Sequence, residues 1–185
     1  MICQNLVEEL EEAYAKQIDH FSDRMVTCIT QVEKMHELLL PTPFLSAVID
    51  DCLTRGIDVT QGGARYNFAG VQAIQIANVA DSLAAIKLLV YDEKKLSAQE
   101  LLHALQTNFE DAPLVRTMLL NKVPKYGNDV PWVDELGAKW VNYFADGLRK
   151  YRNGRGGIYQ MGLYTVSAHV PMGQNVAASA DGRYA

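Results

Sequence analysis

The chain has 185 residues, 49% hydrophobic and 21% charged, which is ordinary for one soluble globular domain. Its formal net charge is −5, with 22 acidic and 17 basic residues, and this balance argues against a general nucleic-acid binder. The apolar runs are far shorter than the roughly 20 residues of a membrane span, and the first residues lack a signal-peptide pattern. We therefore predict a cytoplasmic protein with no nucleic-acid or membrane partner.

Residue patterns alone supply no catalytic set. The three cysteines, Cys3, Cys28 and Cys52, form no C-x-x-C pair, which argues against a zinc knuckle or a disulfide framework. The four histidines are isolated in sequence, and His169, in an apolar setting, fits a structural role better than a ligand or a base. A G-x-S-x-G elbow is absent. These patterns predict no metal site and no bound cofactor.

Residues 6–40 carry a helical pattern in which apolar residues recur at steps of four and three. We call this set the apolar stripe, and it comprises Tyr14, Ile18, Phe21, Met25, Cys28, Val32, Met35 and Leu39. The spacing fits either a coiled coil or a long helix laid across a larger core. Coiled-coil seams prefer aliphatic residues, whereas this stripe mixes Tyr, Phe, Met and Cys, so we favour the second alternative.

A second helix is predicted over residues 43–55, because prolines precede it and Gly56 suits a left-handed C-cap. Its buried face is expected to contain Phe44, Leu45, Val48, Ile49 and Cys52. The glycine-rich stretch 58–81 follows, and within it we predict a short extended segment over residues 64–68.

Two side chains of that extended segment have structural explanations. Arg65 is expected to tie the loop to a carboxylate, and Asn67 to satisfy the backbone of the turn.

The second half of the chain is predicted to be mainly helical. Ser97 and Glu100 form a capping box, and Pro113 suits the first turn of another helix. The helices are predicted from residue 78 or 80 to 91, over 97–109, over 111–121 and over 132–151. Residues 158–170 are β-like, which gives a few strands without obvious partners inside this chain.

The glycine-rich run R-N-G-R-G-G, residues 152–157, could cradle a phosphate through backbone N–H groups. It lacks the G-K-[ST] ending of a P-loop, and it precedes a strand instead of opening a helix. A structural turn is therefore the favoured interpretation.

Six motifs in series resemble the glycyl radical enzymes of the pyruvate formate-lyase superfamily. They are G-G-A-R-Y-N-F-A-G-V-Q (62–72), I-A-N-V-A-D-S-L-A-A-I-K (76–87), K-Y-G-N-D (125–129), K-Y-R-N-G-R-G-G (150–157), G-L-Y-T-V-S-A-H-V-P-M-G (162–173) and A-D-G-R-Y-A (180–185). The resemblance covers nearly the whole chain and lies closest to the branch holding glycerol or propanediol dehydratase and choline trimethylamine-lyase. Gln75 stands where relatives often have glycine.

The resemblance implies an α/β fold, with this chain a mainly helical fragment of an α/β barrel that carries a few strands. It also implies an enzyme of anaerobes that cleaves a C–O, C–N or C–C bond of a small polar substrate. In the intact family, a separate activating enzyme that uses S-adenosylmethionine and an iron–sulfur cluster installs a glycyl radical. That radical generates a thiyl radical on a cysteine within a C-x-E motif.

The chain departs from this pattern at both radical positions. None of its cysteines lies in C-x-E, because the residues two positions on are Asn5, Thr30 and Thr54. The R-V-[AS]-G-[YF] glycyl motif is absent too. We therefore expect residues 1–185 to be a partial pyruvate formate-lyase-like domain without the thiyl loop or the glycyl radical domain. Such a fragment has no catalytic or cofactor-binding residue of its own and is inactive alone.

The G-x-Y-[TS]-V strand of the family runs toward the substrate pocket, which suggests Tyr164 and Thr165 as substrate-side positions. Packing in the barrel wall is the alternative for both. The functional alternative is a non-catalytic helical module that binds a full-length homologue through the apolar stripe. A homo-oligomer is left open.

Overall fold

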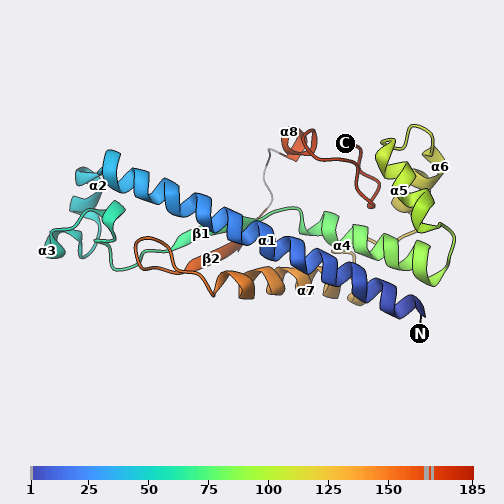
Figure 1. The fold of residues 1–185 in the computed structure, drawn as a ribbon, viewed down its shortest axis with the longest axis horizontal. Coiled ribbons are helices and arrows are strands. Elements are labelled where there is room, and N and C mark those ends of the chain that lie inside the picture. The colour runs from blue at the N-terminus through green and yellow to red at the C-terminus, as the bar shows by residue number, and fades with distance from the viewer. Residues whose placement is uncertain (1, 165–166, 168) are drawn as a thin grey trace. The chain divides into compact units, whose positions relative to one another are not determined.

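The computed structural model describes residues 2–164, 167 and 169–185, and it is mainly helical with one two-stranded parallel sheet (Figure 1). The elements are α1 Ile2–Leu39, α2 Pro43–Val48, α3 Cys52–Arg55, the 3₁₀ helix η1 Val59–Gln61, β1 Ala69–Ala73, α4 Ile76–Ala85, the π-helix η2 Ile86–Asp92, α5 Ala98–Gln106, α6 Pro113–Asn121, α7 Pro131–Leu148, β2 Tyr159–Leu163 and α8 His169–Gly173. Among the described residues, no helix has the length and apolar character needed to cross a membrane.

The chain divides into two compact units. Unit 1 holds the described residues of 1–12, 73–142 and 163–185, and unit 2 holds residues 13–72 and 143–162. Each unit has a hydrophobic core of its own.

The core of unit 1 forms where α4, η2, α5, α6 and α7 meet. Ala80, Ala84 and Ala85 are buried on α4, and Leu89, Leu119 and Val133 are fully buried around them. The small alanines allow the neighbouring helices to pack closely. The predicted capping box is confirmed, because Ser97 accepts from the Glu100 N–H and the Glu100 carboxylate accepts from the Ser97 N–H.

The core of unit 2 forms between α1, the sheet and the end of α7. Met25, Val26 and Ile29 of α1 pack against the cluster of Ala69, Val71, Leu148 and Tyr159. The expectation that the strands lack partners inside the chain is wrong, because β1 pairs with β2. The two strands are far apart in sequence, so no local pattern could reveal this pairing.

The predicted helix over residues 43–55 is also wrong in one respect, because it breaks into α2 and α3. Asp51 lies in the left-handed region, with φ 76°, and this interrupts the helix. Cys52 is buried as expected, but Phe44 is 84% exposed, and Leu45, Val48 and Ile49 are exposed with it. The predicted buried face is therefore wrong for four of its five residues, because burial needs an opposing surface and the described residues offer none there.

Two extended segments also differ from expectation. The strand in the glycine-rich stretch is β1, Ala69–Ala73, not residues 64–68. Among the described residues of the β-like range 158–170, only Tyr159–Leu163 form a strand, and His169–Gly173 form the short helix α8. Glycine at position 62 occupies the left-handed region that a turn requires, and the strand begins only at Ala69.

Candidate functional site

The two glycine-rich motifs dock against each other within unit 2. Asn153 Nδ2 donates to the Asn67 carbonyl at 2.6 Å, and Asn67 Nδ2 donates to the carbonyls of Ala64 at 2.9 Å and Gly62 at 3.3 Å. A Cβ on Gly157 would lie 1.7 Å from the Asn67 carbonyl oxygen, so only glycine allows this approach. The predicted structural role of Asn67 is therefore confirmed.

The expected interaction of Arg65 with a carboxylate is confirmed as well. Arg65 donates from Nε at 3.2 Å and from Nη2 at 3.0 Å to the carboxylate of Asp51. This bidentate pair lowers the pKa of Asp51, chiefly through the hydrogen bond from Arg65.

The turn at residues 152–157 does bind an anion, but the anion is a carboxylate of the same chain. Gly154 donates its N–H to Glu33 Oε2 at 3.0 Å, and Arg155 Nη2 donates to Glu33 Oε1 at 3.0 Å. These two donors fasten the turn to α1, which supports the structural interpretation of the motif over a phosphate site.

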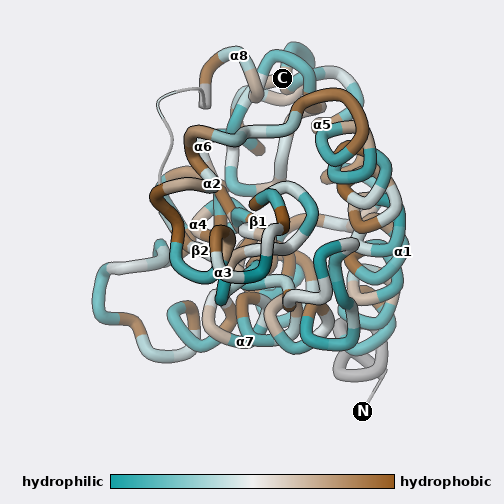
Figure 2. Tube along the Cα trace, turned by 90° about the vertical axis from the view of Figure 1, so that its left-hand side faces the viewer, coloured by the Kyte–Doolittle hydropathy of each residue, from teal (hydrophilic) through white to brown (hydrophobic). Residues whose placement is uncertain are grey.

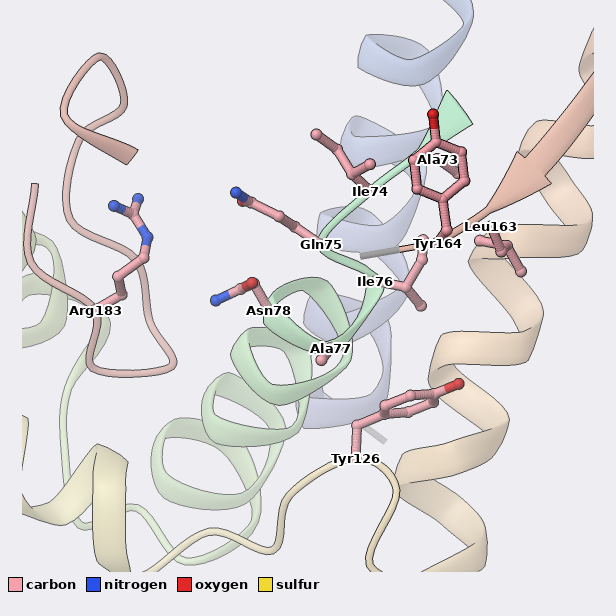
Figure 3. Close-up of a pocket in the computed structure, with 10 residues that line it drawn as sticks. All are labelled: Ala73, Ile74, Gln75, Ile76, Ala77, Asn78, Tyr126, Leu163, Tyr164 and Arg183. Carbon is pink, nitrogen blue, oxygen red and sulfur yellow. The ribbon is translucent and has the colours of Figure 1, made fainter. Parts of the chain in front are cut away.

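The candidate site is a cavity of about 580 Å³ in unit 1, at the N-terminal end of α4 (Figure 3). Gln75, Asn78, Tyr126, Tyr164 and Arg183 supply its polar groups, and residues 73, 74, 76, 77 and 163 line the rest. The Gln75 and Asn78 amides point toward the segment that carries Arg183, whereas the Tyr164 hydroxyl points elsewhere (Figure 3). A cavity of this size accommodates a small organic molecule.

One buried carboxylate holds two of these polar residues in place. Asp181 is 9% exposed, and its Oδ2 accepts from Asn78 Nδ2 at 2.5 Å. Its Oδ1 accepts from Ser179 Oγ at 2.5 Å and from the Arg183 N–H at 3.2 Å. Asp181 thus joins the start of α4 to the C-terminal segment, and it acts as a positioning residue for the cavity wall.

A second carboxylate positions the loop before α7. Asp81 Oδ1 accepts from the Tyr126 N–H at 2.7 Å, and Lys125 Nζ lies 3.9 Å from Asp81 Oδ2. Burial raises the pKa of Asp81, and it outweighs the opposing effects of the Tyr126 N–H and the Lys125 ammonium. Lys125 also donates to the backbone carbonyl of Asp181 at 3.3 Å, so Asp81 and Asp181 belong to one network.

Backbone conformation and close packing shape the cavity further. Gln75 adopts φ 64°, in the left-handed region, where it acts as the N-cap of α4. A Cβ on Gly137 of α7 would lie 2.5 Å from Tyr126 Cε2, so glycine at that position makes room for the Tyr126 ring.

The described lining offers amide, phenol and guanidinium groups to a polar molecule. Arg183 directs its guanidinium nitrogens at protein carbonyls, with Nη1 donating to Tyr184 at 2.6 Å and Nη2 donating to Ala177 at 2.6 Å. None of the described lining residues is a cysteine, a histidine, a lysine or a carboxylate. In the part of the chain that the structure covers, no group of three or more His, Cys, Asp or Glu residues is placed to hold a metal.

Of the two predicted substrate-side residues, Tyr164 lines this cavity, and Thr165 lies outside the described residues. The sequence reasoning did not propose Gln75, Asn78, Tyr126 or Arg183 as site residues. A signal was available, because Asn78, Tyr126 and Arg183 stand in three of the six family motifs. Only the fold reveals that these motifs meet at one cavity.

The family follows from the match of residues 5–173 to the pyruvate formate lyase-like family. The chain belongs to this family. It is 35% identical over 176 residues to the trans-4-hydroxy-L-proline dehydratase of Clostridioides difficile, a match that covers 95% of this chain and 22% of the relative.

Solved structures agree with this membership. A structure from work on 1,2-propanediol dehydration in Roseburia inulinivorans matches with a TM-score of 0.91 and 42% identity over 97% of this chain and 23% of that one. A glycyl radical enzyme from Archaeoglobus fulgidus matches with a TM-score of 0.89 and 33% identity over 96% of this chain and 23% of that one. The chain therefore spans about a fifth of the length of these relatives, and the glycyl radical resemblance is confirmed.

Proposed function

We propose that this chain forms part of the substrate-pocket wall of a cytoplasmic glycyl radical dehydratase or lyase of anaerobic metabolism. The whole enzyme would cleave a C–O, C–N or C–C bond of a small polar molecule. The observation that carries the proposal is the meeting of four family motifs at one polar cavity, through Asn78, Tyr126, Tyr164 and Arg183. The matched dehydratases support the reaction class.

The radical chemistry, in this proposal, depends on groups that the 185 residues do not include. The chain has no C-x-E and no glycyl motif, and positioning alone cannot replace a missing reactive group. We propose that residues 1–185 form a partial pyruvate formate lyase-like domain without the thiyl loop and the glycyl radical domain. The glycyl radical, and the activating enzyme that installs it, belong to the whole enzyme.

The first test is activation. The chain is incubated anaerobically with an activating enzyme and S-adenosylmethionine and examined by electron paramagnetic resonance. We expect no protein radical signal, while an intact propanediol dehydratase treated with its own activating enzyme gives one. A protein-centred doublet from the 185-residue chain would refute the proposed inactivity.

The second test concerns Tyr164 and Thr165, which we propose face the substrate. The matching segment of the Roseburia inulinivorans enzyme is replaced by residues 5–173 of this chain, and Tyr164→Phe and Thr165→Val are introduced. Losing one hydrogen bond to substrate should lower kcat/KM about tenfold. Tyr66→Phe changes an exposed ring that is not among the residues lining the cavity, and as the matched control it should leave kcat/KM unchanged. Equal activity of all variants would assign Tyr164 and Thr165 to barrel-wall packing.

A further inference from the structure

The apolar stripe of α1 lies within unit 2 and is only partly covered by it. Ile18 and Met25 are half-buried, whereas Phe21 is 65% exposed, and Val32 and Leu39 are exposed as well. Soluble chains rarely leave a long contiguous apolar surface open to water, so a surface of this kind marks an interaction site.

The neighbouring face of α1 is firmly attached to unit 2. Tyr143 Oη donates to Asp19 Oδ2 at 2.9 Å, and the Tyr151 hydroxyl donates to Asp23. Farther along the helix, Glu33 binds the turn that contains Arg155. These contacts fix the rotation of the helix about its axis, so the stripe is held ready for a partner before binding.

Part of the apolar stripe lines a groove on the surface of unit 2. A groove of about 740 Å³ is lined by Tyr14, Ile18, Phe21, Met25 and Cys28 of α1 and by Phe144 of α7. The one charged side chain among its described lining residues is Arg24. Figure 2 shows hydrophobic and hydrophilic residues alternating along α1, as expected for a helix with one apolar face.

We propose that this groove seats an amphipathic helix from the remaining polypeptide of a full-length glycyl radical enzyme. The inference rests on the proposed function. Steps of four and three along the stripe match the repeat by which one helix packs on another. The relatives extend to more than four times the length matched here, so the greater part of their chain is available as the occupant.

The chemistry of the groove narrows the occupant further. The apolar surface of the groove is complementary to an occupant with apolar side chains at helical spacing. Arg24, which also lines the groove, is complementary to a carboxylate of the occupant. The occupant is therefore a helix with one apolar face and an acidic flank.

The test uses the whole 185-residue chain as one component. The second component is the Clostridioides difficile trans-4-hydroxy-L-proline dehydratase with its matching segment deleted. Sedimentation velocity measures association, and alkylation of Cys28 followed by mass spectrometry reports on the groove, because Cys28 is exposed in it. We expect a complex in which Cys28 alkylation falls at least tenfold.

Matched variants identify the surface. Phe21→Asp puts a charge into the groove and should weaken association at least tenfold. Phe44→Asp changes an even more exposed aromatic ring, which is not among the groove residues, and this variant should bind as the natural chain does. Both side chains are exposed, so circular dichroism should show unchanged helix content.

Three results would overturn the proposal. They are no association of the natural chain, full association of Phe21→Asp, and a homodimer of the chain alone that Phe21→Asp dissolves. In the third case the occupant is a second copy. A complex with a protected Cys28 that shows no dehydration after activation would leave the docking surface standing and count against the proposed function alone.

Discussion

At the residue scale, Asp58 shows how one carboxylate can organise a turn. Its oxygens accept from the Thr60 N–H at 2.9 Å, Thr60 Oγ1 at 2.7 Å, Ser46 Oγ at 2.7 Å and the Thr42 N–H at 3.0 Å. These hydrogen bonds, led by those from Thr60, lower the pKa of Asp58 from 3.8 to about 2. Asp58 thereby caps η1 and connects it to the start of α2.

The lowered pKa predicts a pH-dependent contribution to stability. The ionised carboxylate is favoured in the folded state, so its contribution is present above pH 3.8 and is lost as the pH falls through about 2. Asp58→Asn should therefore lower the urea midpoint at neutral pH. The difference between the natural chain and the variant should shrink steadily in the acid range. A difference that stays constant with pH would contradict this role.

At the scale of elements, turns fasten the secondary structure of unit 2 together. Close approach of Gly157 to the Asn67 carbonyl brings the turn before β2 onto the segment before β1. Gly70, inside β1, differs from Gly157 because a Cβ there would meet nothing within 4 Å.

This difference predicts that replacing glycine by alanine has a large effect on stability at position 157 and a small one at position 70. In Gly157→Ala the new methyl group would collide with backbone atoms, which cannot move aside as a flexible side chain can. We therefore expect the free energy of unfolding to fall by an amount on the order of 3 kcal/mol. The free energy of unfolding of Gly70→Ala should stay within about 0.5 kcal/mol of that of the natural chain. Chemical denaturation of both variants measures the two values, and equal stability would mean that the approach of the two turns is not needed.

At the scale of the whole molecule, the described residues form two hydrophobic cores. Leu119 is fully buried in the core of unit 1, and Leu148 is fully buried in that of unit 2. Each unit therefore has its own supply of buried apolar surface.

Removing one of these leucines should act mainly on its own unit. Leu119→Ala and Leu148→Ala should each lower the free energy of unfolding by about 2–5 kcal/mol, because each leaves a cavity in a packed core. Hydrogen exchange followed by mass spectrometry should show the largest loss of amide protection in the unit that carries the change. Equal loss in both units for both variants would show that the two cores unfold as one.

The sequence by itself determined the local features and the family. The capping box at Ser97, the proline that begins α6 and the left-handed cap at Gly56 each depend on a few neighbouring residues, and all three are present. The motifs also identified the glycyl radical family in advance of the structural match. Interactions of this kind are short-ranged, so a short stretch of sequence contains all the information that they require.

Only the tertiary structure decided which distant residues meet. Asn78 and Asp181 are 103 positions apart, yet the hydrogen bond between them positions one wall of the cavity. The pairing of β1 with β2 likewise depends on two segments that are distant in the sequence. Phe44 is exposed because no described segment packs against it. Apolar spacing shows which face of a helix can be buried, but the presence of an opposing surface decides whether it is buried. For the apolar stripe of α1, we propose that this surface belongs to the rest of a much longer enzyme.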